Sequence, residues 1–283
     1  MIIIKLKGGL GNQLFQYSFG RLLAFKRNEE LFLDKDILGA KKDSYRQFGL
    51  KHFNITGNVA TPEEIKKTKY PFGIFSKVWR GFKGKILKIH NIGWNPRVLD
   101  SKKSYFDGYW QSYKYPDTIR KILLKELTLK IPIENKYSKI LEKINNPNSI
   151  SLHIRRGDYI NDPKTSKVHN ICDLDYYTRA VKDLADKLDN PIFFIFSDDI
   201  EWVKENLKID FPMIFVSGSG IEDYEELILM SKCKHNIIAN SSFSWWGAWF
   251  NSNEDKIVIA PKKWNNDHPE KFKDLIPESW IKI

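Results

Sequence analysis

The chain has 283 residues, a hydrophobic fraction of 42% and a formal net charge of +11, from 46 Lys and Arg against 35 Asp and Glu. Its two cysteines, Cys172 and Cys233, exclude a disulfide framework or a zinc cluster, which need four or more. No run of 18 apolar residues is present, which excludes a membrane-spanning helix. We therefore expect a soluble, cytoplasmic protein with reduced thiols and a sizeable core.

The first predicted elements are a strand, a glycine-rich turn and a helix. Residues 2–6 are apolar and read as a buried strand, residues 8–12 follow as the turn, and residues 14–24 have helical spacing. This order is how a βαβ unit begins, and residues 31–34 read as a second strand. Because glycine lets the backbone approach a ligand closely, the turn is either a plain tight turn or a ligand-binding loop that includes Asn12.

The region from 40 to 130 predicts only short helices and loops, and it contains a basic, aromatic stretch. Between Lys66 and Lys103 there are 11 Lys or Arg and one acid, Asp100. Apolar residues near helical spacing, flanked by lysines, resemble a helix that lies in a membrane interface. A core-facing helix with solvated lysines is the alternative. On the first interpretation, residues 66–103 make a peripheral contact at the inner face of the membrane.

The second half alternates regularly between strands and helices. The turn cluster at residues 145–148 best marks a domain boundary, so the predicted domains are residues 1–146 and 147–283. The alternation predicts a parallel sheet covered on both faces. Strands are predicted over 150–154, 191–196, 213–216, 236–239 and 256–259, and helices over 173–188, 200–207, 221–231 and 243–251.

Polar residues follow three of these strands. They are His153 with Arg155 and Arg156, Ser197 with Asp198 and Asp199, and Asn240 with Ser241 and Ser242. Since ligands bind beyond the carboxyl ends of parallel strands, we expect the three sets to face one crevice. Two adjacent arginines can clamp a phosphate through parallel hydrogen bonds. A structural ion pair of either arginine with Asp158 is the alternative.

Two further features bear on the ligand of this crevice. The helix that begins within residues 240–244 would direct unpaired N–H groups and its positive dipole end at a phosphate, although Ser and Asn are also the usual N-caps. Asp198 and Asp199 could hold a divalent metal or accept hydrogen bonds from a base or a ribose. Because Arg155 and Arg156 already supply cationic charge, we predict a site without metal. No nucleic-acid-binding motif is present, so no nucleic-acid partner is expected.

Three segments resemble the alpha-1,2-fucosyltransferases of the bacterial type. They are residues 8–17, 153–159 and 238–246, and residues 107–111 and 259–264 also fit the family, in the expected order. The resemblance implies a GT-B-like α/β fold with two Rossmann-like domains facing a cleft. The N-terminal domain would take the acceptor and the C-terminal domain would take GDP-fucose.

The resemblance further implies inverting transfer of L-fucose from GDP-β-L-fucose to the 2-hydroxyl of a galactose acceptor, without metal or cofactor. A lipid-linked saccharide is one form that the acceptor can take. A different linkage, another GDP-sugar, and a non-catalytic protein that binds a nucleotide sugar are the alternatives.

Site residues follow from the same resemblance. Arg155 would contact the β-phosphate, and the nucleotide or its phosphates would be held by His153, Asp199, Ser241, Ser242 and Phe243, with Asn12 approaching from the first domain. Arg156, Asn240 and Ser244 complete the predicted donor-binding set. Asp158 is the candidate catalytic base from its place in the sequence, and orienting the arginines is its alternative role. Asp107 is a second candidate base.

Overall fold

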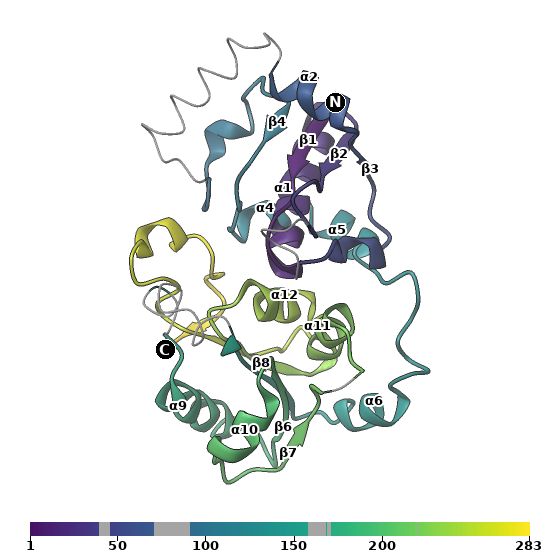
Figure 1. Cartoon of the computed structure of the whole chain (residues 1–283). Coiled ribbons are helices and arrows are strands. Elements are labelled where there is room, and N and C mark those ends of the chain that lie inside the picture. The colour runs from purple at the N-terminus through teal and green to yellow at the C-terminus, as the bar shows by residue number, and fades with distance from the viewer. Residues whose placement is uncertain (40–45, 71–90, 158–167, 169–170, 219) are drawn as a thin grey trace. The chain divides into compact units, whose positions relative to one another are not determined.

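The computed structural model describes residues 1–39, 46–70, 91–157, 168, 171–218 and 220–283 (Figure 1). The chain forms two compact units. Unit 1 comprises Met1–Lys130 and Lys273–Leu275, and unit 2 comprises Ile131–Phe272 and Ile276–Ile283. The turn cluster at residues 145–148 lies inside unit 2, directly before its first strand. The acceptor and donor roles of the two parts stay predictions.

Unit 1 contains a four-stranded parallel sheet with the strand order β3-β2-β1-β4. The central strand β1 has three fully buried isoleucines, as expected for a parallel sheet that is covered on its faces. The predicted strands at 2–6 and 31–34 are confirmed, whereas the two short strands in the 40–130 region were not predicted. The strands are β1 (Ile2–Lys5), β2 (Leu31–Asp34), β3 (Asn58–Val59) and β4 (Tyr105–Phe106).

Helix α1 (Leu10–Arg27) begins earlier than predicted, directly after Gly9. The turn therefore consists of Gly8 and Gly9, and Asn12 lies in the first turn of the helix. Gly8 has a φ of +76°, a left-handed conformation that favours glycine. Within the helix, a Cβ on Gly20 would lie 2.3 Å from Cγ1 of Ile4, so this glycine lets α1 pack closely on β1.

The rest of unit 1, as far as the structure describes it, consists of short helices and loops, as predicted. A final contribution comes from the returning segment Lys273–Leu275. The backbone N–H of Tyr113 donates to the carbonyl of Asp274 at 3.1 Å, and Lys114 forms an ion pair with the Asp274 carboxylate. The short helices are η1 (Gly49–His52), α2 (Pro62–Lys69), η2 (Pro96–Val98), α4 (Lys114–Thr118) and α5 (Arg120–Glu126).

Most of the predicted membrane-interface stretch, from 71 to 90, lies outside the described residues. Within the described ranges, no helix combines the length and the apolar composition needed to cross a membrane.

Unit 2 contains a six-stranded parallel sheet with the strand order β10-β9-β8-β5-β6-β7. This confirms the parallel sheet predicted from the alternation of elements, and the edge strand β10 is an addition to it. The strands are β5 (Ser149–Ile154), β6 (Ile192–Ser197), β7 (Met213–Phe215), β8 (His235–Ile237), β9 (Val258–Ala260) and β10 (Ile281–Lys282).

Helices cover both faces of this sheet (Figure 1). Leu152 and its apolar neighbours on β5 belong to a core that includes residues of α9 and α10. The alternate β5 residues are polar and face α11 and α12: the Ser151 hydroxyl accepts a hydrogen bond from Asn236, whose Nδ2 also donates to the Met230 carbonyl of α11. The helices are α6 (Ser138–Ile144), α9 (Leu174–Ala185), α10 (Ile200–Asn206), α11 (Asp223–Lys232), α12 (Ser242–Phe250) and η3 (Pro269–Phe272).

Candidate active site

The three predicted polar sets meet at the carboxyl edge of the unit-2 sheet. Strand β5 lies between β8 and β6, and Ile154 at its end is opposite Ser197 at the end of β6. His153 lies beside Phe243 of α12, with ring centroids 5.7 Å apart. The residues after β5, β6 and β8 therefore share one edge of the sheet, which is where parallel sheets bind ligands.

Arg155 forms its ion pair with Asp198, on the neighbouring strand end. Nη1 of Arg155 lies 3.1 Å from Oδ2 of Asp198, and the two side chains are 21% and 24% exposed. The other carboxylate oxygen of Asp198 accepts the backbone N–H of Arg156 at 2.8 Å. One carboxylate thus holds both the guanidinium and the backbone at the end of β5. Asp158, which we considered as the ion-pair partner and as the base, lies outside the described residues.

Arg156 is held from two sides. Its Nε donates to Oδ2 of Asp199 at 3.1 Å, and its guanidinium carbon lies 3.3 Å from the ring centroid of Trp202. Stacking of a guanidinium on an aromatic face is attractive and fixes the plane of the group. Trp202 was not among the predicted site residues. A guanidinium has five N–H groups, so Arg156 can donate hydrogen bonds to a ligand while it is paired with one carboxylate.

His153 is buried next to this pair and is only 2% exposed. Burial, with a smaller contribution from the charge of Arg155, lowers the pKa of His153 to about 3. The imidazole is therefore neutral at physiological pH. Its buried Nδ1 has no hydrogen-bond partner among the residues that the structure describes. Such an atom destabilises the fold by about 1–3 kcal/mol until a ligand or water satisfies it.

The segment from 240 to 244 has a mixed role. Ser241 is the N-cap of α12, and its hydroxyl accepts the backbone N–H of Phe243 at 3.3 Å. Asn240 is buried and donates to the carbonyl of Trp264, and the buried Ser244 hydroxyl donates to the carbonyl of Ser241. Ser241 therefore caps α12, which was the alternative interpretation of this segment. Ser242 and Phe243 are partly exposed at the start of the helix.

Ser217 and Glu226 also belong to this edge, and neither was predicted. The backbone N–H of Ser197 donates to the hydroxyl of Ser217 at 2.9 Å. Burial, together with the charges of Asp223 and Asp198, raises the pKa of Glu226 to about 7, although a hydrogen bond with Ser217 lowers it. This carboxyl group titrates near neutrality. Neither residue belongs to a motif, and their positions after β7 and on α11 were the only available signals.

Asn12, the remaining predicted site residue, belongs to unit 1. Its Oδ1 accepts a hydrogen bond from Nε2 of Gln111 at 2.7 Å. A Cβ on Gly8 would lie 2.7 Å from Nδ2 of Asn12, so the glycine turn is closely fitted around this side chain. The role of Asn12 toward the donor stays a prediction.

Within the described part of the chain, no three or more His, Cys, Asp or Glu side chains are grouped to hold a metal ion. Cys172 and Cys233 are both free thiols. The metal independence of the site stays a prediction.

The chain was compared with known proteins. All of it, residues 1–283, matches glycosyl transferase family 11. The O-antigen biosynthesis glycosyltransferase WbnK of Escherichia coli is 35% identical over 98% of this chain and 99% of its own. An alpha-1,2-colitosyltransferase of Escherichia coli is 33% identical over 100% and 99% of the two chains. The galactoside alpha-(1,2)-fucosyltransferase 2 of Mus musculus is 27% identical over 55% and 46%.

The fold is also similar to that of a solved structure. The fucosyltransferase NodZ from Bradyrhizobium superposes with a TM-score of 0.52 and 13% identity, over 87% of this chain and 91% of that one. At this identity the likeness concerns the fold, and it supports the predicted α/β, GT-B-like class with two Rossmann-like units. Because the sequence match extends from the first residue to the last, the chain belongs to glycosyl transferase family 11.

Proposed function

We propose that the protein transfers L-fucose from GDP-β-L-fucose to the 2-hydroxyl of a galactose-type acceptor, with inversion at the anomeric carbon. The observation that carries this proposal is the Arg155–Arg156 pair, fixed by Asp198 and Asp199 at the carboxyl edge of the unit-2 sheet, in a chain that matches family 11 throughout. The sugar and the linkage are supported by the names of the colitosyl and fucosyl relatives.

In this proposal the donor binds at the carboxyl edge of unit 2. Arg155 and Arg156 donate to the diphosphate, because a guanidinium matches phosphate oxygens through parallel hydrogen bonds. The N–H groups at the start of α12 add donors and a favourable dipole there, through Ser242 and Phe243 on the Ser241 cap. Asn240 and Ser244 support that cap from the inside.

The nucleoside part of the donor is assigned to the other polar groups. Nδ1 of neutral His153, which has no hydrogen-bond partner among the described residues, and the carboxylate of Asp199 would hydrogen-bond it. Titration of the whole protein with GDP checks this assignment: His153→Ala should weaken GDP binding, and an unchanged Kd would exclude His153 from the site.

The reaction breaks the bond between C1 of fucose and the β-phosphate oxygen while the acceptor oxygen bonds to C1 from the opposite face. GDP leaves with the bonding electron pair, so negative charge grows on the β-phosphate. Guanidinium groups that are already in place stabilise this charge more in the transition state than in the ground state, which raises kcat. The acceptor proton is lost late, because C1 is already strongly cationic.

We propose Asp158, next to the arginine pair in sequence, as the group that takes this proton. If Asp158→Asn keeps nearly full activity, this assignment fails.

The direct test is incubation of the purified protein with GDP-fucose and a panel of β-galactosides, followed by linkage analysis of the product. We expect an α-1,2-linked fucoside and unchanged turnover with a chelator present. A product with another linkage would contradict the assigned regiochemistry, and inactivation by the chelator would contradict metal independence.

A second donor follows from one comparison. The colitosyltransferase is similar over the whole chain, and colitose is fucose without its 3-hydroxyl. A parallel assay with GDP-colitose therefore decides between the two sugars. Binding of either donor without transfer to any acceptor would favour a nucleotide-sugar-binding protein instead of an enzyme.

We further propose a cytoplasmic protein that touches the inner face of the membrane, where a lipid-linked saccharide would be its acceptor. The support is the charge of residues 66–103, with 11 Lys or Arg and one acid. Anionic lipids favour such segments by about 1 kcal/mol for each basic residue near the surface. Co-sedimentation with liposomes should increase with their anionic lipid content, and binding that ignores lipid charge would refute the contact.

A further inference from the structure

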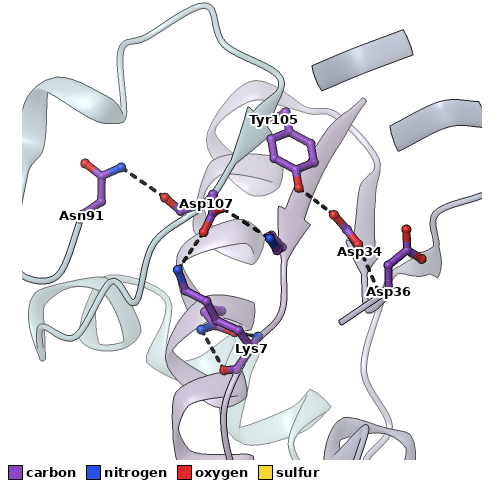
Figure 2. Close-up of polar contacts among 8 residues, drawn as sticks. Lys7, Asp34, Asp36, Asn91, Tyr105 and Asp107 are labelled. Carbon is purple, nitrogen blue, oxygen red and sulfur yellow. Dashed lines mark hydrogen bonds and ion pairs between the residues drawn. The ribbon is translucent and has the colours of Figure 1, made fainter. Parts of the chain in front are cut away.

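A second polar cluster lies at the carboxyl edge of the unit-1 sheet (Figure 2). Strands β1 and β4 are parallel neighbours, with Ile4 opposite Phe106, so the residues that follow them are close together. Nζ of Lys7 lies 2.7 Å from Oδ1 of Asp107, and Nζ of Lys5 lies 3.6 Å from Oδ2. The Asp107 side chain is 37% exposed, against 20% and 18% for the lysines. A ligand at this edge therefore meets the carboxylate first.

The charge state of Asp107 limits what it can do. Burial raises the pKa of Asp107, but the hydrogen bond from Lys7 and the charges of Lys7, Lys5 and Lys69 outweigh this effect, so the pKa lies below its usual value. The side chain is ionised at neutral pH and can only accept hydrogen bonds. A carboxylate with a low pKa is a weak general base, so the structure disfavours that role for Asp107. It suits a ligand that offers hydroxyl groups.

The segment after Asp107 is held in a strained conformation. Trp110 has a φ of +55°, in a region that bulky residues rarely adopt, and its fully buried ring stacks on Phe19 with centroids 3.8 Å apart. The backbone N–H groups of Tyr109 and Trp110 both donate to the carbonyl of Asn91, at 2.7 and 3.1 Å. Strain of this kind persists only where the surroundings enforce it, and it is frequent at ligand sites.

This conformation places polar side chains together at the sheet edge. The Tyr109 ring lies beside Lys7, whose Nζ is 4.5 Å from the ring centroid. Gln111 donates to Asn12 in the first turn of α1 at 2.7 Å. The segment from Asp107 to Gln111 thus joins the ends of β1 and β4 to the start of α1.

We propose that Asp107 and Tyr109 bind the acceptor, and that its recognised part is a neutral hexopyranose. The Asp107 carboxylate would accept hydrogen bonds from two neighbouring hydroxyl groups of the sugar. These hydrogen bonds are strong because the carboxylate is charged. The Tyr109 ring would pack against the sugar ring. Lys7 is a positioning residue that holds the carboxylate. This inference rests on the proposed function, since it locates the acceptor of that reaction.

The test separates acceptor binding from donor binding. Acceptor KM, kcat and the Kd for GDP-fucose are measured for the wild type, Asp107→Asn and Tyr109→Ala. Asp36→Asn, which changes an exposed carboxylate after β2, is the matched control (Figure 2). Losing a hydrogen bond to a charged group should raise the acceptor KM of Asp107→Asn about tenfold to a hundredfold. The Kd for GDP-fucose should not change. Equal acceptor KM values in wild type and both variants would overturn the proposal, as would a parallel loss of donor affinity.

Deoxy acceptors identify the hydroxyl groups concerned. With an analogue that lacks a recognised hydroxyl, the acceptor KM values of wild type and Asp107→Asn should differ much less. The reason is that the analogue and the substitution remove the same hydrogen bond. Acceptor binding is also followed directly, by ligand-observed NMR without donor. If the wild type binds galactosides but transfers nothing, the proposed function fails while this inference is still decided by the variants. If the wild type binds no neutral hexopyranoside, this inference fails.

Discussion

Arg156 lies against Trp202, with its guanidinium carbon 3.3 Å from the ring centroid. Because Asp199 holds Nε of the same group, the guanidinium has little freedom to rotate. A cation that is fixed before the ligand arrives loses less conformational entropy on binding than a mobile one. The ion pairs of this site are therefore compatible with phosphate binding, since they orient the arginines.

Replacing Trp202 tests this stacking. Cation–π contacts contribute about 0.5–2 kcal/mol, so Trp202→Leu should weaken GDP binding about 2- to 30-fold, whereas Trp202→Phe should keep most of the affinity. Calorimetric titration with GDP measures both. Equal affinity of the leucine variant would mean that the ring does not prepare Arg156 for binding.

Arg155→Lys tests the assignment of Arg155 to the leaving group. Lysine keeps the charge but replaces a planar fork by a point charge, so we expect kcat/KM to fall about 100-fold, or about 3 kcal/mol. Arg179→Lys is the control, because Arg179 pairs with Asp175 on the exposed surface of α9. Steady-state kinetics that show the same kcat/KM for wild type and Arg155→Lys would remove Arg155 from the mechanism.

Gly157→Ala tests the position of Asp198. A Cβ on Gly157 would lie 2.3 Å from Oδ2 of Asp198, so the carboxylate must move and the Arg155 pair must rearrange. We expect kcat/KM to fall about tenfold or more, since small misplacements at a reacting centre are costly. Gly218→Ala is the control, because its Cβ would have no atom of the described residues within 4 Å. Similar kinetics of the two alanine variants would contradict the role given to Asp198.

The low pKa of His153 predicts a loss of stability in acid. The folded-state pKa is about 3 against 6.5 for an unperturbed histidine, so between these values the unfolded state binds a proton that the folded state does not. The His153 contribution to the free energy of unfolding should therefore fall by up to about 1.4 kcal/mol per pH unit below pH 6.5. Urea unfolding of wild type and His153→Gln from pH 4.5 to 7.5 isolates this contribution. A constant difference between the two proteins would refute it.

The raised pKa of Glu226 predicts the opposite trend of stability with pH, and this trend lies near neutrality. Its pKa of about 7 in the folded state lies above the usual 4.5, so the folded state holds an extra proton between these values. Stability from this group is present at low pH and is lost as the pH rises toward 7. The Tm of Glu226→Gln relative to wild type should be higher at pH 8 than at pH 5. If thermal scans show the same Tm difference at both values, Glu226 is not a buried, protonated carboxyl.

The sequence predicted unit 2 better than unit 1 because its signals are local. Residues 150–154 alternate apolar and polar side chains, residues 191–196 form an apolar run, and polar residues follow both, so the strands and their shared edge could be inferred. In unit 1, β3 and β4 have two residues each and pair with strands that are distant along the chain. No short-range pattern specifies such pairing.

The partners of the site residues were less predictable than the residues themselves. Arg155 pairs with Asp198 because their strands are neighbours, which depends on the strand order of the whole sheet. The left-handed conformation of Trp110 likewise depends on its stacking with Phe19. Propensity would not place a tryptophan there, and only tertiary packing explains it.

The path of the chain has a practical consequence for Asp274. Unit 1 takes Lys273–Leu275 from near the C-terminus, after which the chain returns to unit 2 and ends with β10. Neither unit is one uninterrupted piece of sequence. A fragment that stops at residue 130 would lack Asp274, and with it the ion pair to Lys114 and the hydrogen bond from the backbone N–H of Tyr113. Separate expression of unit 1 requires a re-ordered gene that carries these three residues, and separate expression of unit 2 requires a gene from which they are removed.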